Sequence, residues 1–147
     1  MTALSSAAKK RVLVLCTGNS ARSQMAEGLL RHLAGGAMEV YSAGTKPVGV
    51  NPLAVEAMRE LNIDISAQRC KSVSEFANQN FDTVITVCDS AAEQCPIFPG
   101  APQRIHWSLP DPAAVAGPHA EKLQSFREVR EALAAHLRQF LNKRVAS

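Results

Sequence analysis

The sequence predicts an α/β fold, an open four-stranded parallel sheet flanked by helices on both faces. Short apolar segments rich in β-branched residues alternate with segments whose apolar residues recur at helical spacing, and this alternation is typical of parallel βαβ units. The length of 147 residues is enough for one buried core. We therefore expect residues 1–10 to be a flexible N-terminal tail and residues 11–147 to form a single domain.

The first half of the chain predicts two strands and two helices. The apolar run that ends at Leu15 is typical of a buried parallel strand, and Gly35 is a stop signal after the first helical segment. Asn51 and Pro52 mark a helix start, because asparagine caps a helix well and proline suits its first position. In order, the elements are a strand at 11–15, a helix at 21–33, a strand at 38–42 and a helix at 51–61.

The second half predicts two more strands and a long final helix. Its elements, in order, are one or two helical turns at 72–77, a strand at 82–88, a short helix at 90–94, a strand at 104–108, a rigid loop at 109–112 and an amphipathic helix from 118 onward. The carboxyl ends of parallel strands share one edge of a sheet. We therefore expect Cys16, Cys88 and Asp111, which follow three of the strands, to lie at that edge.

Charge and composition exclude several classes of function. The formal net charge is +3, and the basic residues are scattered along the chain, so we expect no nucleic-acid binding. No apolar run approaches the length of a membrane span, and the polar start lacks the features of a secretory signal. We expect a cytoplasmic monomer with no membrane contact. Its four cysteines then indicate a catalytic, redox or metal role more than structural disulfides.

The segment at 16–22, Cys-Thr-Gly-Asn-Ser-Ala-Arg, lies between the first predicted strand and helix. Gly18 permits a sharp turn, so that successive N–H groups can point inward at an anion, next to the positive end of the helix. Arg22 can bind two oxygens of an oxyanion with its planar guanidinium. The same surroundings favour the thiolate form of Cys16. One loop therefore supplies both a nucleophile and a cradle for a tetrahedral oxyanion.

The longer string at 14–28, Val-Leu-Cys-Thr-Gly-Asn-Ser-Ala-Arg-Ser-Gln-Met-Ala-Glu-Gly, resembles the low-molecular-weight tyrosine phosphatase fold. Within that fold it resembles the arsenate reductases that are recycled by thioredoxin. The resemblance covers nearly the whole chain after residue 10. It continues through Tyr41-Ser42-Ala43-Gly44, Asn51-Pro52, Ile63-Asp64-Ile65-Ser66, 84–88, Cys95-Pro96, His106-Trp107 and Asp111-Pro112.

The resemblance implies a role for each residue of the loop. Cys16 is the nucleophile, and Arg22 clamps the anion. Ser23 stabilises the thiolate through a hydrogen bond, and Asn19 braces the loop. Asp111 is the general acid that protonates the departing oxygen, a task that requires placement within hydrogen-bond reach. The residues implied to bind substrate are Thr17, Gly18, Asn19, Ser20, Ala21, Arg22 and Ser23.

Cys88 and Cys95 decide between a phosphatase and a reductase. They flank the polar segment at 89–94 and not a core run, which favours redox chemistry over apolar packing. Seven residues of intact helix rise by about 10.5 Å, whereas a disulfide needs Cα atoms within roughly 7 Å. If the segment is helical when reduced, we expect it to bend or unwind when the two sulfurs join.

By resemblance, the chain reduces arsenate with electrons from thioredoxin. Cys16 forms a thiol–arsenate adduct, and Cys88 attacks Cys16 as arsenite leaves. Cys95 then forms a disulfide with Cys88, which thioredoxin reduces. Ala113 and Ala114 stand where the phosphatases carry an aromatic residue that grips an aryl ester, which favours arsenate. A protein tyrosine phosphatase and a non-enzymatic redox or oxyanion sensor stay open as alternatives, as do glutaredoxin and a small thiol as the reductant.

We expect no metal ion and no cofactor. The histidines and cysteines show no metal-ligand spacing. Some relatives hold a potassium ion behind the loop, and Asn19, Glu27 and Ser42 match part of that site. A further carboxylate is missing, and Lys71 can supply the ion's charge instead.

Two other residues carry no predicted chemistry. Cys70 lies among polar residues and is expected to be a bystander thiol. His106, beside Trp107, is expected to be a packing residue.

Overall fold

The computed structural model describes the backbone of residues 9–146 and the side chains of residues 9–143. It contains one four-stranded sheet, in the order β2-β1-β3-β4, with every pair of neighbouring strands parallel. The strands are β1 (Lys10–Cys16), β2 (Met38–Gly44), β3 (Thr83–Thr86) and β4 (Gln103–His106). The predicted sheet is confirmed. Residues 1–8 of the predicted tail lie outside the described residues, and β1 begins at Lys10, one residue earlier than predicted.

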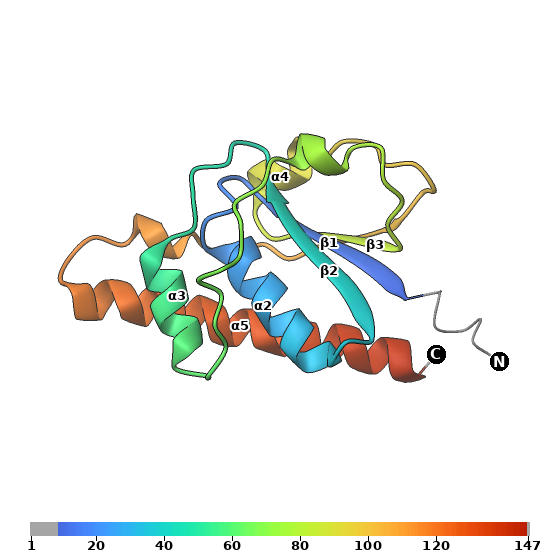
Figure 1. The fold of residues 1–147 in the computed structure, drawn as a ribbon. Helices are drawn as coiled ribbons and strands as arrows, with labels where there is room; N and C mark the ends of the chain where they lie inside the picture. Colours follow the sequence, from blue (N-terminus) through green and yellow to red (C-terminus); the bar gives the residue numbers. More distant parts are fainter. Residues whose placement is uncertain (1–8, 147) are drawn as a thin grey trace.

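Helices cover both faces of the sheet, as predicted (Figure 1). They are α2 (Arg22–Ala34), α3 (Pro52–Arg59), α4 (Asp89–Glu93) and α5 (His119–Ala146), with 3-10 turns η1 (Val73–Phe76) and η2 (Pro112–Ala114). α2, α3 and α5 pack together on one side, whereas α4 lies near the end of the sheet to which β2 points (Figure 1). Within residues 9–146, no helix combines the length and the apolar character needed to cross a membrane.

β1 and β3 are the two inner strands, and the connections that follow them lead to opposite edges of the sheet. The chain passes from β1 through α2 to β2 on one side, but from β3 through α4 to β4 on the other. Parallel sheets bind ligands at such a reversal, beyond the carboxyl ends of the strands. The reversal therefore places the residues that follow Cys16 and Thr86 around a common crevice.

Local signals set the ends of α2 and α3 as the sequence predicts. Gly35 ends α2 with a φ of 60°, the left-handed backbone that glycine adopts without strain. The side chain of Asn51 accepts a hydrogen bond from the N–H of Leu53 at 2.8 Å, and Pro52 occupies the first helical position of α3. These two signals are confirmed.

β3 and β4 are shorter than the strands predicted at 82–88 and 104–108. One hydrogen bond continues past β3, from the N–H of Val87 to the carbonyl of Leu15 at 3.0 Å. Cys88 then becomes the N-cap residue of α4, so the chain leaves the ladder to start a helix. Because β3 ends early, Cys88 and α4 lie at the carboxyl edge of the sheet.

The two faces of the sheet are covered by different kinds of core. Ser42 of β2 faces α2, where it contacts Glu27, so the neighbouring Tyr41 faces the opposite side. There Tyr41 joins three phenylalanine rings, with centroids 5.5–6.1 Å apart and tilted or edge-to-face planes. The rings are Tyr41, Phe76, Phe81 and Phe98. The aromatic cluster covers the face of the sheet that α2 leaves open.

Candidate active site

The sulfur of Cys16 is buried at the carboxyl end of β1, with only 2% of the residue exposed. The backbone N–H of Asn19 donates to this sulfur at 3.2 Å, and the hydroxyl of Ser23 lies 2.7 Å from it. Asn19 adopts a φ of 47°, a left-handed conformation that asparagine tolerates better than most residues. A backbone N–H and a hydroxyl therefore contact the sulfur directly.

The carbonyl groups of the loop 16–22 are held on its outer side. Backbone N–H groups of the segment 45–51 bind four of them at 2.8–3.2 Å. The pairs are Thr45 with Cys16, Lys46 with Thr17, Val48 with Gly18 and Asn51 with Ser20. With these carbonyls engaged outside, the N–H groups of the turn are left for its interior, which is the arrangement that an oxyanion needs.

Gly44, the last residue of β2, lets the loop lie directly against the sheet. A Cβ atom at this position would lie 2.5 Å from the carbonyl oxygen of Thr17 and 2.8 Å from the nitrogen of Asn19. Both are backbone atoms of the loop, so a side chain here would displace the loop itself. Sequence reasoning used Gly44 only as part of a family motif and missed this contact, because it joins residues far apart in the chain.

Arg22 links the oxyanion loop to the segment that carries Asp111. Its Nη1 donates to the carbonyl of Leu109 at 2.9 Å, which lies two residues before Asp111. The exposed carboxylate of Asp111 accepts from the N–H of Ala113 at 3.0 Å and so caps the 3-10 turn η2. Arg22 and Asp111 are therefore brought into neighbouring loops by a contact that sequence reasoning did not foresee.

Cys88 lies at the oxyanion loop. It is buried, and its sulfur lies 3.3 Å from Oγ1 of Thr17, the residue next to Cys16. As the N-cap residue of α4 it has an extended backbone, with φ of −146° and ψ of 154°. The structure thus places Cys88 against Thr17, the residue that follows Cys16 in the oxyanion loop.

Cys95 lies just beyond the other end of α4, half-buried. Burial raises the pKa of the Cys95 thiol, and the nearby Arg104 guanidinium opposes that rise. A cavity of about 190 Å³ lies between Cys95, Ala92 and the side chains of β4. In this structure all four cysteines are free thiols, and α4 separates Cys88 from Cys95.

His106, which the sequence assigns to packing more than to catalysis, makes two hydrogen bonds that sequence reasoning did not foresee. Its Nδ1 lies 2.7 Å from Oγ1 of Thr86, and its Nε2 lies 2.9 Å from Oδ1 of Asp89. The hydrogen bond to His106 is the main cause that lowers the pKa of Asp89. Trp107 instead stacks on His136 with ring centroids 4.8 Å apart. Trp107 directly follows β4 and continues its ladder through a hydrogen bond to Thr86, and neighbouring residues of an extended chain point to opposite faces.

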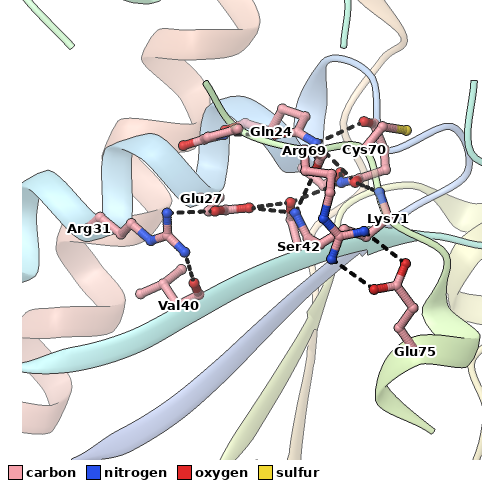
Figure 2. A network of polar contacts seen from close by, with 12 residues as sticks. Gln24, Glu27, Arg31, Val40, Ser42, Arg69, Cys70, Lys71 and Glu75 are labelled. Atoms are coloured by element: carbon pink, nitrogen blue, oxygen red, sulfur yellow. Dashed lines mark hydrogen bonds and ion pairs between the residues drawn. The ribbon is translucent and has the colours of Figure 1, made fainter. Parts of the chain in front are cut away.

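A buried polar network lies behind the loop (Figure 2). Glu27 accepts from Ser42 at 2.5 Å and pairs with Arg31 at 2.8 Å and Lys71 at 3.4 Å. Asn19 donates from Nδ2 to Ser42 and Ser23, and its Oδ1 accepts from the backbone N–H of Lys71. The network connects the loop to α2, β2 and the segment before η1.

The residues that match a potassium site do not fit that ion in this chain. The ammonium group of Lys71 already lies 3.4 Å from Oε1 of Glu27 and donates to the carbonyl of Arg69 at 2.6 Å. Arg31 neutralises the other oxygen of the same carboxylate. Among the described side chains, no group of three or more His, Cys, Asp or Glu residues is placed to hold a metal ion.

Cys70 contacts the loop and is more than a surface thiol. Its sulfur accepts from the N–H of Gly49 at 3.1 Å and donates to the carbonyl of Gly18 at 3.4 Å. Cys70 therefore braces the outer side of the loop, together with the segment 45–51.

Comparisons with known proteins agree with this geometry. The family model of low molecular weight phosphotyrosine protein phosphatases matches residues 11–147. An arsenate reductase of Halalkalibacterium halodurans is 45% identical over 132 residues, which cover 90% of this chain and 95% of that protein.

Solved structures give the same result. An arsenate reductase in its oxidized state has a TM-score of 0.77 at 31% identity, with 91% of this chain and 98% of the other covered. A thioredoxin-dependent arsenate reductase of Corynebacterium glutamicum has a TM-score of 0.73 at 28% identity, with 94% and 63% covered. The chain therefore belongs to the low molecular weight phosphotyrosine protein phosphatase family.

Proposed function

We propose that this chain reduces arsenate to arsenite with Cys16 as the nucleophile and Cys88 and Cys95 as relay thiols. The observation that carries the proposal is the 3.3 Å contact between the sulfur of Cys88 and the hydroxyl of Thr17 in the oxyanion loop. A phosphatase cycle ends with water and needs no second thiol at that place. The relatives at about 45% identity are named arsenate reductases, which supports the same function.

The first step is attack of the Cys16 thiolate on arsenic. Backbone N–H groups of the loop 16–22 and the guanidinium of Arg22 hold the arsenate oxygens, and Arg22 exchanges its bond with Leu109 for this contact. Asp111 protonates the departing oxygen, which leaves as water. A sulfur–arsenic bond has then replaced one arsenic–oxygen bond.

The second step transfers electrons to arsenic. The Cys88 thiolate attacks the sulfur of Cys16, the electron pair of the sulfur–arsenic bond moves to arsenic, and arsenic(V) becomes arsenic(III) and leaves as arsenite. A Cys16–Cys88 disulfide remains. Thr17 holds Cys88 next to the loop before this step, through their 3.3 Å contact. Two thiols have together supplied the two electrons that the arsenic gained.

The third step moves the disulfide away from the loop. The Cys95 thiolate attacks Cys88, and Cys16 leaves as a thiolate, ready for another arsenate. α4 spans only Asp89–Glu93, between an extended Cys88 and Cys95, and we expect this short helix to bend or open as their sulfurs meet. The dithiol of thioredoxin then reduces the Cys88–Cys95 disulfide.

The residues that follow Asp111 favour an inorganic anion as the substrate. Ala113 and Ala114 follow the Asp111-Pro112 pair and form η2 with Pro112. Neither residue offers a ring against which an aryl phosphate would stack. The tyrosine of the chain, Tyr41, packs into the aromatic cluster on the sheet, away from the loop.

We also propose that the enzyme is a cytoplasmic monomer that works without potassium. The buried ammonium of Lys71 next to Glu27 supports independence from potassium. A relay of thiols that has to begin its cycle reduced suits a reducing compartment.

The test is arsenate-dependent NADPH consumption in the presence of thioredoxin and thioredoxin reductase. We expect continuous turnover by the wild type and none by Cys16→Ser, Cys88→Ser or Cys95→Ser. Cys70→Ser is the matched control. A serine hydroxyl can still accept from Gly49 and donate to Gly18 as the thiol does, so this variant is expected to keep turnover. Fast aryl phosphate hydrolysis without arsenate turnover would instead assign a phosphatase, and neither activity would point to a sensor.

A further inference from the structure

We propose that Ser125 of α5 is a positioning residue that holds the general acid Asp111 in place through the carbonyl of Pro112. The hydroxyl of Ser125 donates to this carbonyl at 2.9 Å, and Pro112 directly follows Asp111 in the chain. This inference rests on the proposed function, in which Asp111 is the acid of the first step.

The carboxylate of Asp111 is tied to the turn η2. Its Oδ1 accepts from the N–H of Ala113 at 3.0 Å, and the carbonyl of the same aspartate accepts from the N–H of Ala114 at 3.1 Å. Prolines at 110 and 112 restrict the backbone on both sides of Asp111. The turn and the carboxylate therefore shift together, so a contact that fixes η2 also aims the acid.

Two side chains from helices donate to the backbone of the segment 109–115. Arg22 of α2 donates to the carbonyl of Leu109 at 2.9 Å, and Ser125 of α5 donates to that of Pro112. In the first step of the proposed reaction, Arg22 exchanges its bond with Leu109 for contacts with the arsenate oxygens. The bond from Ser125 then still ties η2 to the helices while Asp111 gives its proton.

A cavity of about 270 Å³ adjoins η2, between the segment 110–115 and α5. Asp111 and Ser125 both line it. Atoms that border empty space lack packing partners on that side, so η2 has room to shift once the bond from Ser125 is removed. A small shift is enough to disturb catalysis, because proton transfer requires the acid within hydrogen-bond reach of the departing oxygen.

Ser125 has a fixed position from which to hold η2. Its hydroxyl also lies 2.6 Å from the carbonyl of Lys122, one turn earlier in α5. Two carbonyls thus share its single proton in a three-centre bond, and the contact within the helix sets the direction of the hydroxyl. Two residues further along α5, Arg127 pairs with Glu60 at the end of α3 at 2.6 Å.

The test compares Ser125→Ala with Asp111→Asn and with the double variant. One readout is the rate at which arsenite forms in a single turnover. The other is kcat/KM for the hydrolysis of phenyl phosphate and of para-nitrophenyl phosphate, which reports the steps up to departure of the phenol. Phenolate needs a proton to leave more than nitrophenolate does, so the first ester depends more on the acid. Inhibition by inorganic phosphate measures binding to the loop separately.

We expect Ser125→Ala to lower the arsenite rate and the kcat/KM for phenyl phosphate about tenfold, less than the roughly 100-fold of a displacement by about 1 Å. The loss for the nitrophenyl ester should be smaller, and inhibition by phosphate should not change. In the Asp111→Asn background, Ser125→Ala should cause no further loss, because the side chain that it aims is no longer an acid.

Three controls separate positioning from folding. Alanine forms helices better than serine, so we expect Ser125→Ala to keep the melting temperature of the wild type. Ser125→Thr retains a hydroxyl that can reach a carbonyl of the preceding turn, and it should restore the rates. Gln124→Ala, which changes the exposed neighbour on α5, is the matched control and is expected to leave all rates unchanged.

An equal loss for both esters, or the full loss in the Asp111→Asn background, would overturn the inference, since Ser125 would then act on the fold and not through Asp111. Wild-type rates in folded Ser125→Ala would overturn it as well. The expected pattern with the two esters, in a protein that forms no arsenite, would instead count against the proposed function alone. A wild type that neither forms arsenite nor hydrolyses either ester would contradict both.

Discussion

The imidazole Nε2 of His106 lies 2.9 Å from Oδ1 of Asp89, and this contact fastens the first residue of α4 to the last residue of β4. The other ring nitrogen of His106 lies 2.7 Å from the hydroxyl of Thr86, at the end of β3. One side chain thus ties the short helix between Cys88 and Cys95 to two strands of the sheet. We expect this tie to break when α4 opens for disulfide transfer.

His106→Ala is expected to speed formation of the Cys88–Cys95 disulfide under a fixed oxidant by a few-fold. The pair is exposed to solvent, so the substitution releases only a weak contact. Mass mapping of disulfides against time gives the rate, and amide hydrogen exchange in 89–94 reports the opening. His119→Ala, which removes a comparable exposed contact to Glu56, is the control. Unchanged exchange in 89–94 would show that His106 does not hold α4.

The same contact predicts a dependence on pH. The hydrogen bond to His106 lowers the pKa of Asp89 in the folded protein. A carboxylate with a depressed pKa contributes its stabilisation above the unfolded value and loses it as pH falls. We therefore expect hydrogen exchange in α4, corrected for intrinsic rates, to increase under acidic conditions. Asp89→Asn should remove that increase.

Arg104 is expected to assist the resolving thiol. Burial raises the pKa of Cys95, and the charge of Arg104 opposes the rise. Arg104→Gln should therefore slow the attack of Cys95 on Cys88 several-fold at neutral pH, with recovery as the pH rises. Stopped-flow measurement of the resolving step tests this, and an equal slowing at every pH would argue for lost packing instead.

Gly44→Ala is expected to damage the oxyanion loop. The added Cβ would meet the backbone of Thr17 at 2.5 Å and that of Asn19 at 2.8 Å. A loop displaced on the scale of an ångström costs on the order of 100-fold in turnover, with far less effect on the melting temperature. Gly36→Ala is the matched control. Gly36 has a φ of 90° and open space around it, so its substitution should destabilise the fold but spare the activity.

Glu60 is expected to set part of the acid stability. Hydrogen bonds from Arg127 and Arg130 of α5 lower the pKa of Glu60 from 4.5 to about 2. The tie between the end of α3 and α5 is therefore intact above about pH 4.5 and lost as the pH falls toward 2. Urea unfolding across this window should show a steeper loss of stability for the wild type than for Glu60→Gln. Parallel curves would show that Glu60 does not contribute to the loss of stability at acidic pH.

Local patterns allowed much of the fold to be predicted from the sequence. The buried run before Cys16, the glycine that ends α2 and the Asn51–Pro52 start of α3 each depend on neighbouring residues alone. The loop between β1 and α2 was predictable for the same reason. The hydrogen bonds of its carbonyl groups were not predictable, because the register of β2 decides where their partners in 45–51 lie.

Contacts between distant segments account for what sequence reasoning missed. The bond from Arg22 to Leu109 depends on how the loop after β4 returns over the sheet. The role of His106 depends on which face of β4 it occupies, and a dipeptide with tryptophan carries no such information. Lys71 was linked to Glu27 by family likeness, but the contacts of Glu27 with Ser42 and of Lys71 with Asn19 depend on how α2 packs on β2.

Disulfide mapping after a single turnover with arsenate, without reductant, tests the three-cysteine relay most directly. Wild-type protein should carry a Cys88–Cys95 disulfide with Cys16 free, and Cys95→Ser should stop with a Cys16–Cys88 disulfide. Arsenite should appear once per protein in both. Arsenite release that leaves Cys88 reduced, or a bridge from Cys16 to Cys70, would contradict the relay.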